Sequence, residues 1–144
     1  MAQLTANENR VFEVGIEPVY NDIPVLNAVA IYAGACVGES ASTGNARQLE
    51  DGDTFLGFAT AKADNSSGAV GDKNVRVRMQ GLVNLTVGGT LADDDLGAAV
   101  YATDSNTFSK TDSGSDTQIG VIHRFIDTTT AIVFFQATSL RSIS

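Results

Sequence analysis

Residues 97–137 decide the fold. Three apolar stretches, GAAVYAT (97–103), TQIGVIHRF (117–125) and TAIVFFQA (130–137), follow one another with polar segments between them. Each stretch has the length of a strand and is rich in Val, Ile, Phe, Tyr and Thr. Asp, Ser, Asn and Gly bound the stretches, which is typical of strands that are joined by turns. This region therefore predicts the core of an all-β domain.

The same order of short motifs occurs upstream, which indicates an internal repeat. Gly57 and Gly120 take the same place in the two copies, and we expect strands to bend or approach closely there, because a glycine within a strand otherwise only weakens it. We therefore predict a small β-barrel or β-sandwich built from two similar three-stranded halves, each of which covers a face of the other. Three pairs of segments match: residues 31–33 with 100–102, TFLGFA (54–59) with TQIGVI (117–122), and VRVRMQG (75–81) with AIVFFQA (131–137).

The chain of 144 residues has the length of one domain, but its first part differs from the rest. Residues 1–24 contain both prolines, and proline cannot donate to a strand ladder. We predict an extended N-terminal arm at residues 1–24 and a β-domain at residues 25–144. The sequence leaves open whether the arm pairs with its own sheet or adds a strand to another chain. The arm carries isolated apolar side chains: Leu4, Val11, Phe12, Val14 and Ile16.

The charge balance is acidic, with 17 Asp and Glu against 9 Lys and Arg and a formal net charge of −8. Binding to the nucleic-acid backbone needs basic patches, and an anionic membrane surface repels such a chain, so we expect neither as a partner. Arg76 and Arg78 form the dense basic spot of the sequence, on the polar side of an alternating strand. We expect them to face water or to pair with acidic residues across a subunit interface.

The sequence contains few side chains that suit catalysis or metal binding. The chain has one histidine and one cysteine, which nearly excludes a zinc site, and it contains no phosphate-binding glycine loop. His123 alternates with Ile119, Val121 and Phe125, which predicts a partly buried structural histidine rather than a general base. The start lacks a signal-peptide pattern, and no apolar stretch reaches membrane-spanning length. We expect no catalytic residue, no cofactor and no metal, and a protein that is not an enzyme.

The order of these motifs resembles that of the small capsid decoration (cement) proteins of tailed bacteriophages. The elements are an aliphatic-Tyr-Ala motif, a polar loop, a Thr-x-Ile-Gly-Val motif and a short apolar strand. The resemblance covers about residues 25–137. It is carried by GAAVYATDSNTFSKTDSGSDTQIGVI (97–122) and TAIVFFQA (130–137), with TFLGFAT (54–60) and VRVRMQG (75–81) as upstream copies.

The resemblance implies a β-rich protomer that binds the major capsid protein on the outer surface of the virion after synthesis in the host cytoplasm. It also implies a homo-oligomer, with a trimer favoured, and an N-terminal segment that touches the capsid. This chain departs from shorter family members in its longer arm and its larger loops at residues 39–53 and 62–74. The expected capsid or inter-subunit contacts are Leu4, Val11, Phe12, Val14, Ile16, Arg76 and Arg78.

Two other functions compete with capsid decoration. One is another virion β-module, such as a tail, fibre or adhesin domain. The other is a β-barrel that binds a small molecule or a glycan. Glycan sites commonly use exposed Trp or Tyr rings, and this chain has no Trp and only three Tyr, which weighs against the glycan alternative.

Overall fold

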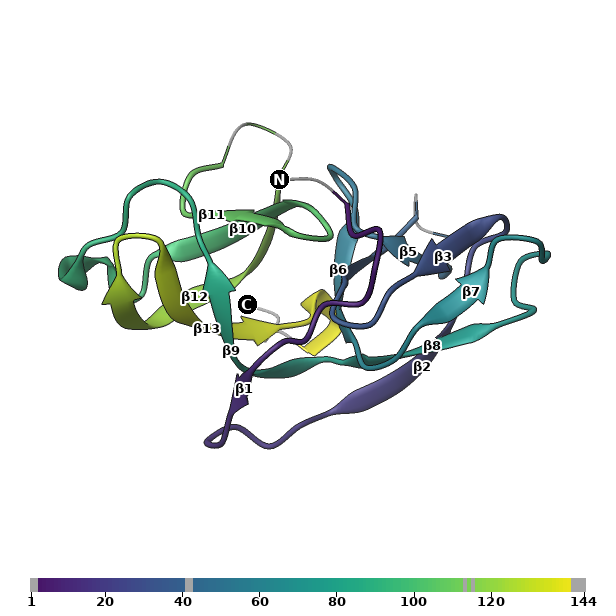
Figure 1. The fold of residues 1–144 in the computed structure, drawn as a ribbon, viewed down its shortest axis with the longest axis horizontal. Coiled ribbons are helices and arrows are strands. Elements are labelled where there is room, and N and C mark those ends of the chain that lie inside the picture. Colours follow the sequence, from purple (N-terminus) through teal and green to yellow (C-terminus); the bar gives the residue numbers. More distant parts are fainter. Residues whose placement is uncertain (1–2, 41–42, 113, 115, 141–144) are drawn as a thin grey trace.

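Figure 1 shows a computed structural model of the chain, whose described residues are 3–40, 43–112, 114 and 116–140. Within them, antiparallel strands form three sheets, which confirms the predicted all-β fold. Helical structure in these residues is limited to two 3-10 turns, η1 (Asp93–Asp95) and η2 (Thr138–Leu140). None of the helices in the described part is long and apolar enough to cross a membrane.

The strands divide into sheets of six, five and two strands. Sheet A has the order β1 (Phe12–Glu13), β9 (Gln80–Thr86), β13 (Thr130–Gln136), β12 (Thr117–Asp127), β10 (Ala99–Asp104) and β11 (Thr107–Ser109). Sheet B has the order β2 (Tyr20–Pro24), β8 (Asn74–Arg78), β6 (Thr54–Ala59), β4 (Cys36–Glu39) and β5 (Ala46–Gln48). Sheet C is the ribbon of β3 (Val29–Ile31) and β7 (Ala63–Asn65).

The two large sheets repeat one topology. The order β2-β8-β6-β4-β5 of sheet B has its counterpart in the order β9-β13-β12-β10-β11 of sheet A, with the strands of each set in the same chain order. We call the first set unit 1 and the second set unit 2. The chain passes directly from β8 of unit 1 to β9 of unit 2 through Met79, and Figure 1 shows the two units side by side.

The register of the strands repeats as well. Val37 of β4 lies opposite Gly57 of β6, Val100 of β10 lies opposite Gly120 of β12, and in both units the register shifts at the next residue. Each glycine allows a close approach to the neighbouring strand, which is β8 for Gly57 and β13 for Gly120. A Cβ atom would lie 2.4 Å from the carbonyl oxygen of Arg78 at Gly57, and 2.0 Å from that of Phe134 at Gly120. The predicted equivalence of Gly57 and Gly120 is therefore confirmed.

Each unit curls until the two ends of its strand order come into contact, which are β2 and β5 in unit 1 and β9 and β11 in unit 2. One parallel bridge joins the chain after β2 to β5, and another joins the chain after β9 to β11. The hydrogen bonds are equivalent, because the Leu26 N–H donates to the Ala46 carbonyl at 2.9 Å and the Gly88 N–H donates to the Phe108 carbonyl at 2.8 Å. Each contact is an isolated bridge rather than a ladder, so neither unit is a fully closed barrel in the described residues.

Two details of the predicted repeat are wrong. Residues 31–33 do not correspond to residues 100–102, because β3 pairs with β7 in sheet C and the counterpart of β10 is β4. The chain turns at Gly34, whose φ of +84° suits glycine, and enters the sheet only after this turn. Each unit also has five strands instead of three, because the first strand and a short hairpin strand (β5 or β11) join the predicted three.

The two units pack head to tail. The core of unit 1 contains its own inward side chains, such as Val37, Val75 and Val77, together with Leu4 and Ala137 from outside the unit. The core of unit 2 also includes Phe55 and Phe58, which lie on the outer face of unit 1. Phe58 packs edge to face against Phe135 with ring centroids 4.9 Å apart. The outer face of β4 and β6 therefore fills the open end of unit 2.

Candidate functional site

The N-terminal segment, predicted as an arm, lies along the junction of the two units (Figure 1). The sequence left its pairing open, and the structure pairs it within the chain: β1 adds to β9 of unit 2 and β2 adds to β8 of unit 1. Leu4, a predicted contact, is buried at 9% exposure in the core of unit 1. Its N–H donates to the Ser105 hydroxyl in unit 2 at 2.9 Å. Leu4 thus holds the two units together from within.

Arg10 fastens the same junction. Its Nε donates to the Gly34 carbonyl before β4 at 2.7 Å, and its Nη2 donates to Asn106 Oδ1 in unit 2 at 2.8 Å. The guanidinium also lies over the rings of Phe58 and Phe108, at 5.7 and 5.4 Å from their centroids. Burial lowers the pKa of Arg10, against the opposing effect of the nearby Glu8 carboxylate. Arg10 therefore connects the two units through hydrogen bonds and cation–π contacts to both of them.

The other predicted contacts on this segment differ in exposure. Phe12 is half-buried and packs against Phe58 and Phe135. Ile16 is half-buried, and Val11 is exposed at 59% while its carbonyl accepts the Asn84 N–H. Val14, in the turn between β1 and β2, is fully exposed at 103%. Of these residues, Val11 and Val14 expose the largest share of their apolar side chains.

Arg76 and Arg78 lie on one face of β8 but make different contacts. Arg76 is 61% exposed and donates to the Asp22 carboxylate of β2 at 3.1 Å. Arg78 donates to the Gln80 carbonyl at 3.2 Å, and its guanidinium lies 4.4 Å from the Phe12 ring centroid. Tyr20, opposite Arg78 on β2, is 49% exposed. The outer face of the β2–β8 pair therefore presents Tyr20, Asp22 and Arg76 to solvent.

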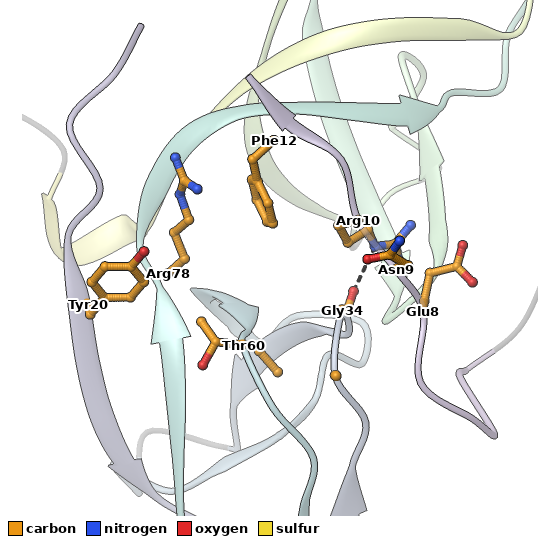
Figure 2. A pocket seen from close by; sticks show the side chains of 10 residues that line it. Glu8, Asn9, Arg10, Phe12, Tyr20, Gly34, Thr60 and Arg78 are labelled. Atoms are coloured by element: carbon orange, nitrogen blue, oxygen red, sulfur yellow. Dashed lines mark hydrogen bonds between the residues drawn. The ribbon is translucent and has the colours of Figure 1, made fainter. Parts of the chain in front are cut away.

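A pocket of about 260 Å³ lies between this face and the N-terminal segment. Figure 2 shows Arg78 and Tyr20 on one side of it and Arg10 and Asn9 on the other. Both arginines belong to its wall and lack a carboxylate within ion-pair distance in the described residues, whereas Arg47, Arg76 and Arg124 each have one. Their guanidinium groups lie far apart in Figure 2, so the view does not show them converging on one ligand.

The side chains that catalysis or metal binding would need do not lie together in the described residues. His123 is exposed instead of partly buried, because a register shift at this residue breaks the alternation, so that Ile119 and Ile122 are the buried residues. Cys36 is completely buried, and burial raises the pKa of its thiol. In the described part of the chain, no group of three His, Cys, Asp or Glu side chains is placed to hold a metal ion.

A second depression of about 200 Å³ lies on the outer face of β12 and β13, and the sequence reasoning missed it. Its position follows from the repeat, since Val121 is the counterpart of Phe58. The depression is lined by Gln118, Gly120, Val121, Phe134 and Gln136.

Comparison with known proteins adds no relative: no protein-family model matches this chain, and no curated protein matches its sequence.

Proposed function

We propose that this chain is a capsid decoration (cement) protein, which binds the outer surface of a bacteriophage head and stabilises the lattice of the major capsid protein. The resemblance of residues 97–122 and 130–137 to that family supports the proposal, and the all-β fold is consistent with it. The same resemblance supports a homo-oligomer, with three copies favoured, on the outside of the virion.

The observation that carries the proposal is the outer face of the β2–β8 pair. Tyr20, Asp22 and Arg76 stand side by side there, exposed on an otherwise regular two-stranded surface. Tyr and Arg are enriched in protein interfaces and in the residues that carry most of the binding energy. An exposed ion pair contributes little to folding, so Asp22 and Arg76 are available to a partner at small cost.

The fold suits a protein that holds other subunits. The passage of β8 into β9 and the hydrogen bonds of Leu4 and Arg10 join the two units at several points. A ligand that binds only the assembled lattice stabilises it by mass action. Many copies that bridge neighbouring subunits reinforce each other through effective concentration. No reaction is needed for this function.

The direct test mixes the purified protein with expanded, undecorated capsids of the phage that encodes it. Co-sedimentation with the capsids and a higher melting temperature of the shell are the expected results. A protein that stays in the supernatant and leaves the shell melting unchanged would refute the proposal. In that case, binding to tail or fibre components and to glycan arrays would test the two competing functions.

The docking face is tested by the double variant Tyr20→Ala, Arg76→Ala. Both side chains are exposed, so the variant should fold normally while its affinity for capsids falls by about tenfold or more. Lys62→Ala is the matched control, because it removes an exposed positive charge from the connection between β6 and β7. Equal loss in the control would assign the effect to overall charge instead of this face.

A further inference from the structure

Arg78 is a half-buried arginine whose charge has no acidic partner. Its Nε donates to the Gln80 carbonyl at 3.2 Å, and its guanidinium lies 4.4 Å from the Phe12 ring centroid. Neither contact neutralises the charge, and among the described residues no carboxylate lies within ion-pair distance. Acidic groups are plentiful in this chain, with 17 Asp and Glu against 9 Lys and Arg. Arg78 is therefore an uncompensated cation in an acidic protein.

The Arg78 side chain is oriented before any partner arrives. The hydrogen bond to Gln80 uses Nε, and the ring of Phe12 supports the guanidinium. Gly81 leaves room for it, because a Cβ atom there would lie 2.9 Å from both Nε and Nη2 of Arg78. The two Nη groups make no hydrogen bond within the described part of the chain. They form a planar pair of donors that matches the two oxygens of a carboxylate.

Arg78 lines the pocket of about 260 Å³ beside the outer face of the β2–β8 pair. Tyr20 is paired with Arg78 across the two strands, and Figure 2 shows its hydroxyl turned toward Arg78. This hydroxyl makes no hydrogen bond to the described residues, so it can donate to the same ligand. Tyr20 and Thr60 are exposed on this side of the pocket, which leaves it open to a side chain from outside.

The opposite end of the pocket is less suitable for an anion. Arg10 already donates through Nε to the Gly34 carbonyl and through Nη2 to Asn106. The Glu8 carboxylate acts on the charge of Arg10, and Figure 2 shows Glu8 beside Arg10 and away from Arg78. A carboxylate that enters the pocket is therefore repelled by Glu8 at one end and attracted by Arg78 at the other.

We propose that the Arg78 end of this pocket receives an acidic side chain, from Asp or Glu, of the partner that docks on the outer face of the β2–β8 pair. The proposal rests on the proposed function, because it names the group that the partner presents to this face. Arg76 is a weaker attractant, since the Asp22 carboxylate already pairs with it. A polyanion such as a nucleic acid is a poor occupant, because the net charge of −8 repels its other phosphates.

Capped tripeptides test the pocket without a capsid. NMR spectra of the isotope-labelled protein follow the Arg78 Nε–H signal and the Thr60 amide signal while acetyl-Gly-Glu-Gly-amide is added. Both signals should shift and saturate, because the glutamate carboxylate binds at the Nη groups. Acetyl-Gly-Gln-Gly-amide has nearly the same shape without the charge and should leave both signals in place. Equal shifts with the two peptides, or no shift with either, would overturn the proposal.

Variants show whether Arg78 is the group that binds. Arg78→Gln should abolish the response of Thr60 to the glutamate peptide, and Arg78→Lys should weaken binding by about tenfold, because it keeps the charge but loses the planar donors. Arg124→Gln is the matched control, since Arg124 is 56% exposed and pairs with Glu13 outside the pocket. Thermal unfolding shows that each variant is folded. Equal loss of binding in Arg124→Gln would assign the response to net charge and refute the pocket.

Binding to expanded capsids separates this proposal from the proposed function. Arg78→Gln should weaken capsid binding by about tenfold or more, whereas Arg124→Gln should not. If the unmodified protein and Arg78→Gln bind capsids equally well, the acidic contact is refuted and capsid decoration stands. If the glutamate peptide binds at Arg78 but the unmodified protein does not bind capsids, capsid decoration is refuted and the preference of the pocket for a carboxylate stands.

Discussion

Unit 1 and unit 2 share a backbone arrangement but carry different surfaces on equivalent strands. At equivalent positions of β8 and β13, unit 1 has Arg78 and unit 2 has Phe134. Two residues earlier on the same strands, unit 1 has exposed Arg76 and unit 2 has buried Ile132. The inward positions of both units are apolar, as Val77 and its counterpart Val133 show. The backbone of a repeat is thus preserved while its outer face changes with what lies against it.

The direction of the difference follows from the head-to-tail contact. The outer face of β4 and β6 in unit 1 is covered, and it carries Phe55 and Phe58. The equivalent positions in unit 2 are Gln118 and Val121, which are smaller or more polar, and Val121 is only half-buried. The outer face of β2 and β8 in unit 1 is open to water and carries charges. Burial therefore determines which copy carries the large apolar residues.

Replacing Gly57 or Gly120, which take the same register position in the two units, with alanine should have the largest effect on stability. A Cβ atom at Gly57 or Gly120 would stand within 2.4 Å of a carbonyl oxygen on the neighbouring strand, far inside van der Waals contact. Gly57 adds a φ of +134°, which an alanine rarely adopts. We expect each variant to lower the free energy of unfolding by more than about 4 kcal/mol, with Gly57→Ala the more severe, as measured by urea titration.

Gly44→Ala is the control for these glycines. Gly44 also has a positive φ, of +79°, but a Cβ atom there would meet nothing within 4 Å. We expect a loss of only about 1 kcal/mol from backbone strain. If Gly120→Ala cost no more than Gly44→Ala, the close approach of β12 and β13 would not be required for folding, and the equivalence of the units would lose its physical basis.

Phe58→Ala and Val121→Ala compare equivalent positions on the covered and the open face. Phe58 is completely buried among aromatic rings of both units, so its truncation should cost about 3–4 kcal/mol. Val121 is half-buried, so the same truncation should cost less than about 1 kcal/mol. Thermal and urea unfolding of both variants give the numbers. Similar losses at the two sites would show that the outer face of unit 2 is as well packed as that of unit 1.

Much of this comparison was visible in the sequence, and its failures have physical causes. The alternation and β-rich composition predicted β6, β8, β12 and β13 at nearly their observed bounds, because strand periodicity is a local property. The match of TFLGFA (54–59) with TQIGVI (117–122) correctly aligned Gly57 with Gly120. The match of residues 31–33 was wrong, because the chain turns at Gly34 before it enters β4, and beside this turn the Glu8 N–H, far away in the chain, donates to the Ala33 carbonyl at 2.8 Å.

The candidate surfaces were harder to predict. Leu4 and Val14 look alike in the sequence as isolated apolar residues, yet one is buried in a core and the other is fully exposed. Their difference depends on long-range hydrogen bonds such as that from Leu4 to Ser105, which no local pattern encodes. The depression near Phe134 required the register of three strands. Burial patterns are local, whereas the covering of an outer face is a property of the whole chain.

Leu4→Ala should show that the N-terminal segment stabilises both units. Leu4 is buried in the core of unit 1 and its backbone is tied to unit 2, so we expect a loss of about 2–3 kcal/mol in the free energy of unfolding. Val11→Ala, which shortens an exposed side chain of the same segment, should cost less than about 0.5 kcal/mol. A Leu4→Ala variant as stable as Val11→Ala would mean that the segment covers the units without holding them together.

The ion pair between Asp22 and Arg76 gives the smallest expected effect. The hydrogen bond from Arg76 lowers the pKa of the Asp22 carboxyl, with a further contribution from the charge of Arg76. Asn84 and Ile132 take the equivalent places in unit 2 and do not titrate. Because the folded-state pKa lies below the unfolded one, the pair stabilises the protein above the ordinary Asp pKa of about 4, and the effect is lost as the pH falls through the lowered value.

Titration of the carboxyl carbons by NMR measures this effect without unfolding the protein. Arg76→Ala should return the pKa of Asp22 to the usual range of about 4, while the pKa of Asp64, lowered by its own hydrogen bonds to Ser66, should stay where it is. An unchanged Asp22 would mean that the two side chains do not pair in solution. The outer face of unit 1 would then present separate charges instead of a matched pair, and any partner that binds there would have to neutralise each of them independently.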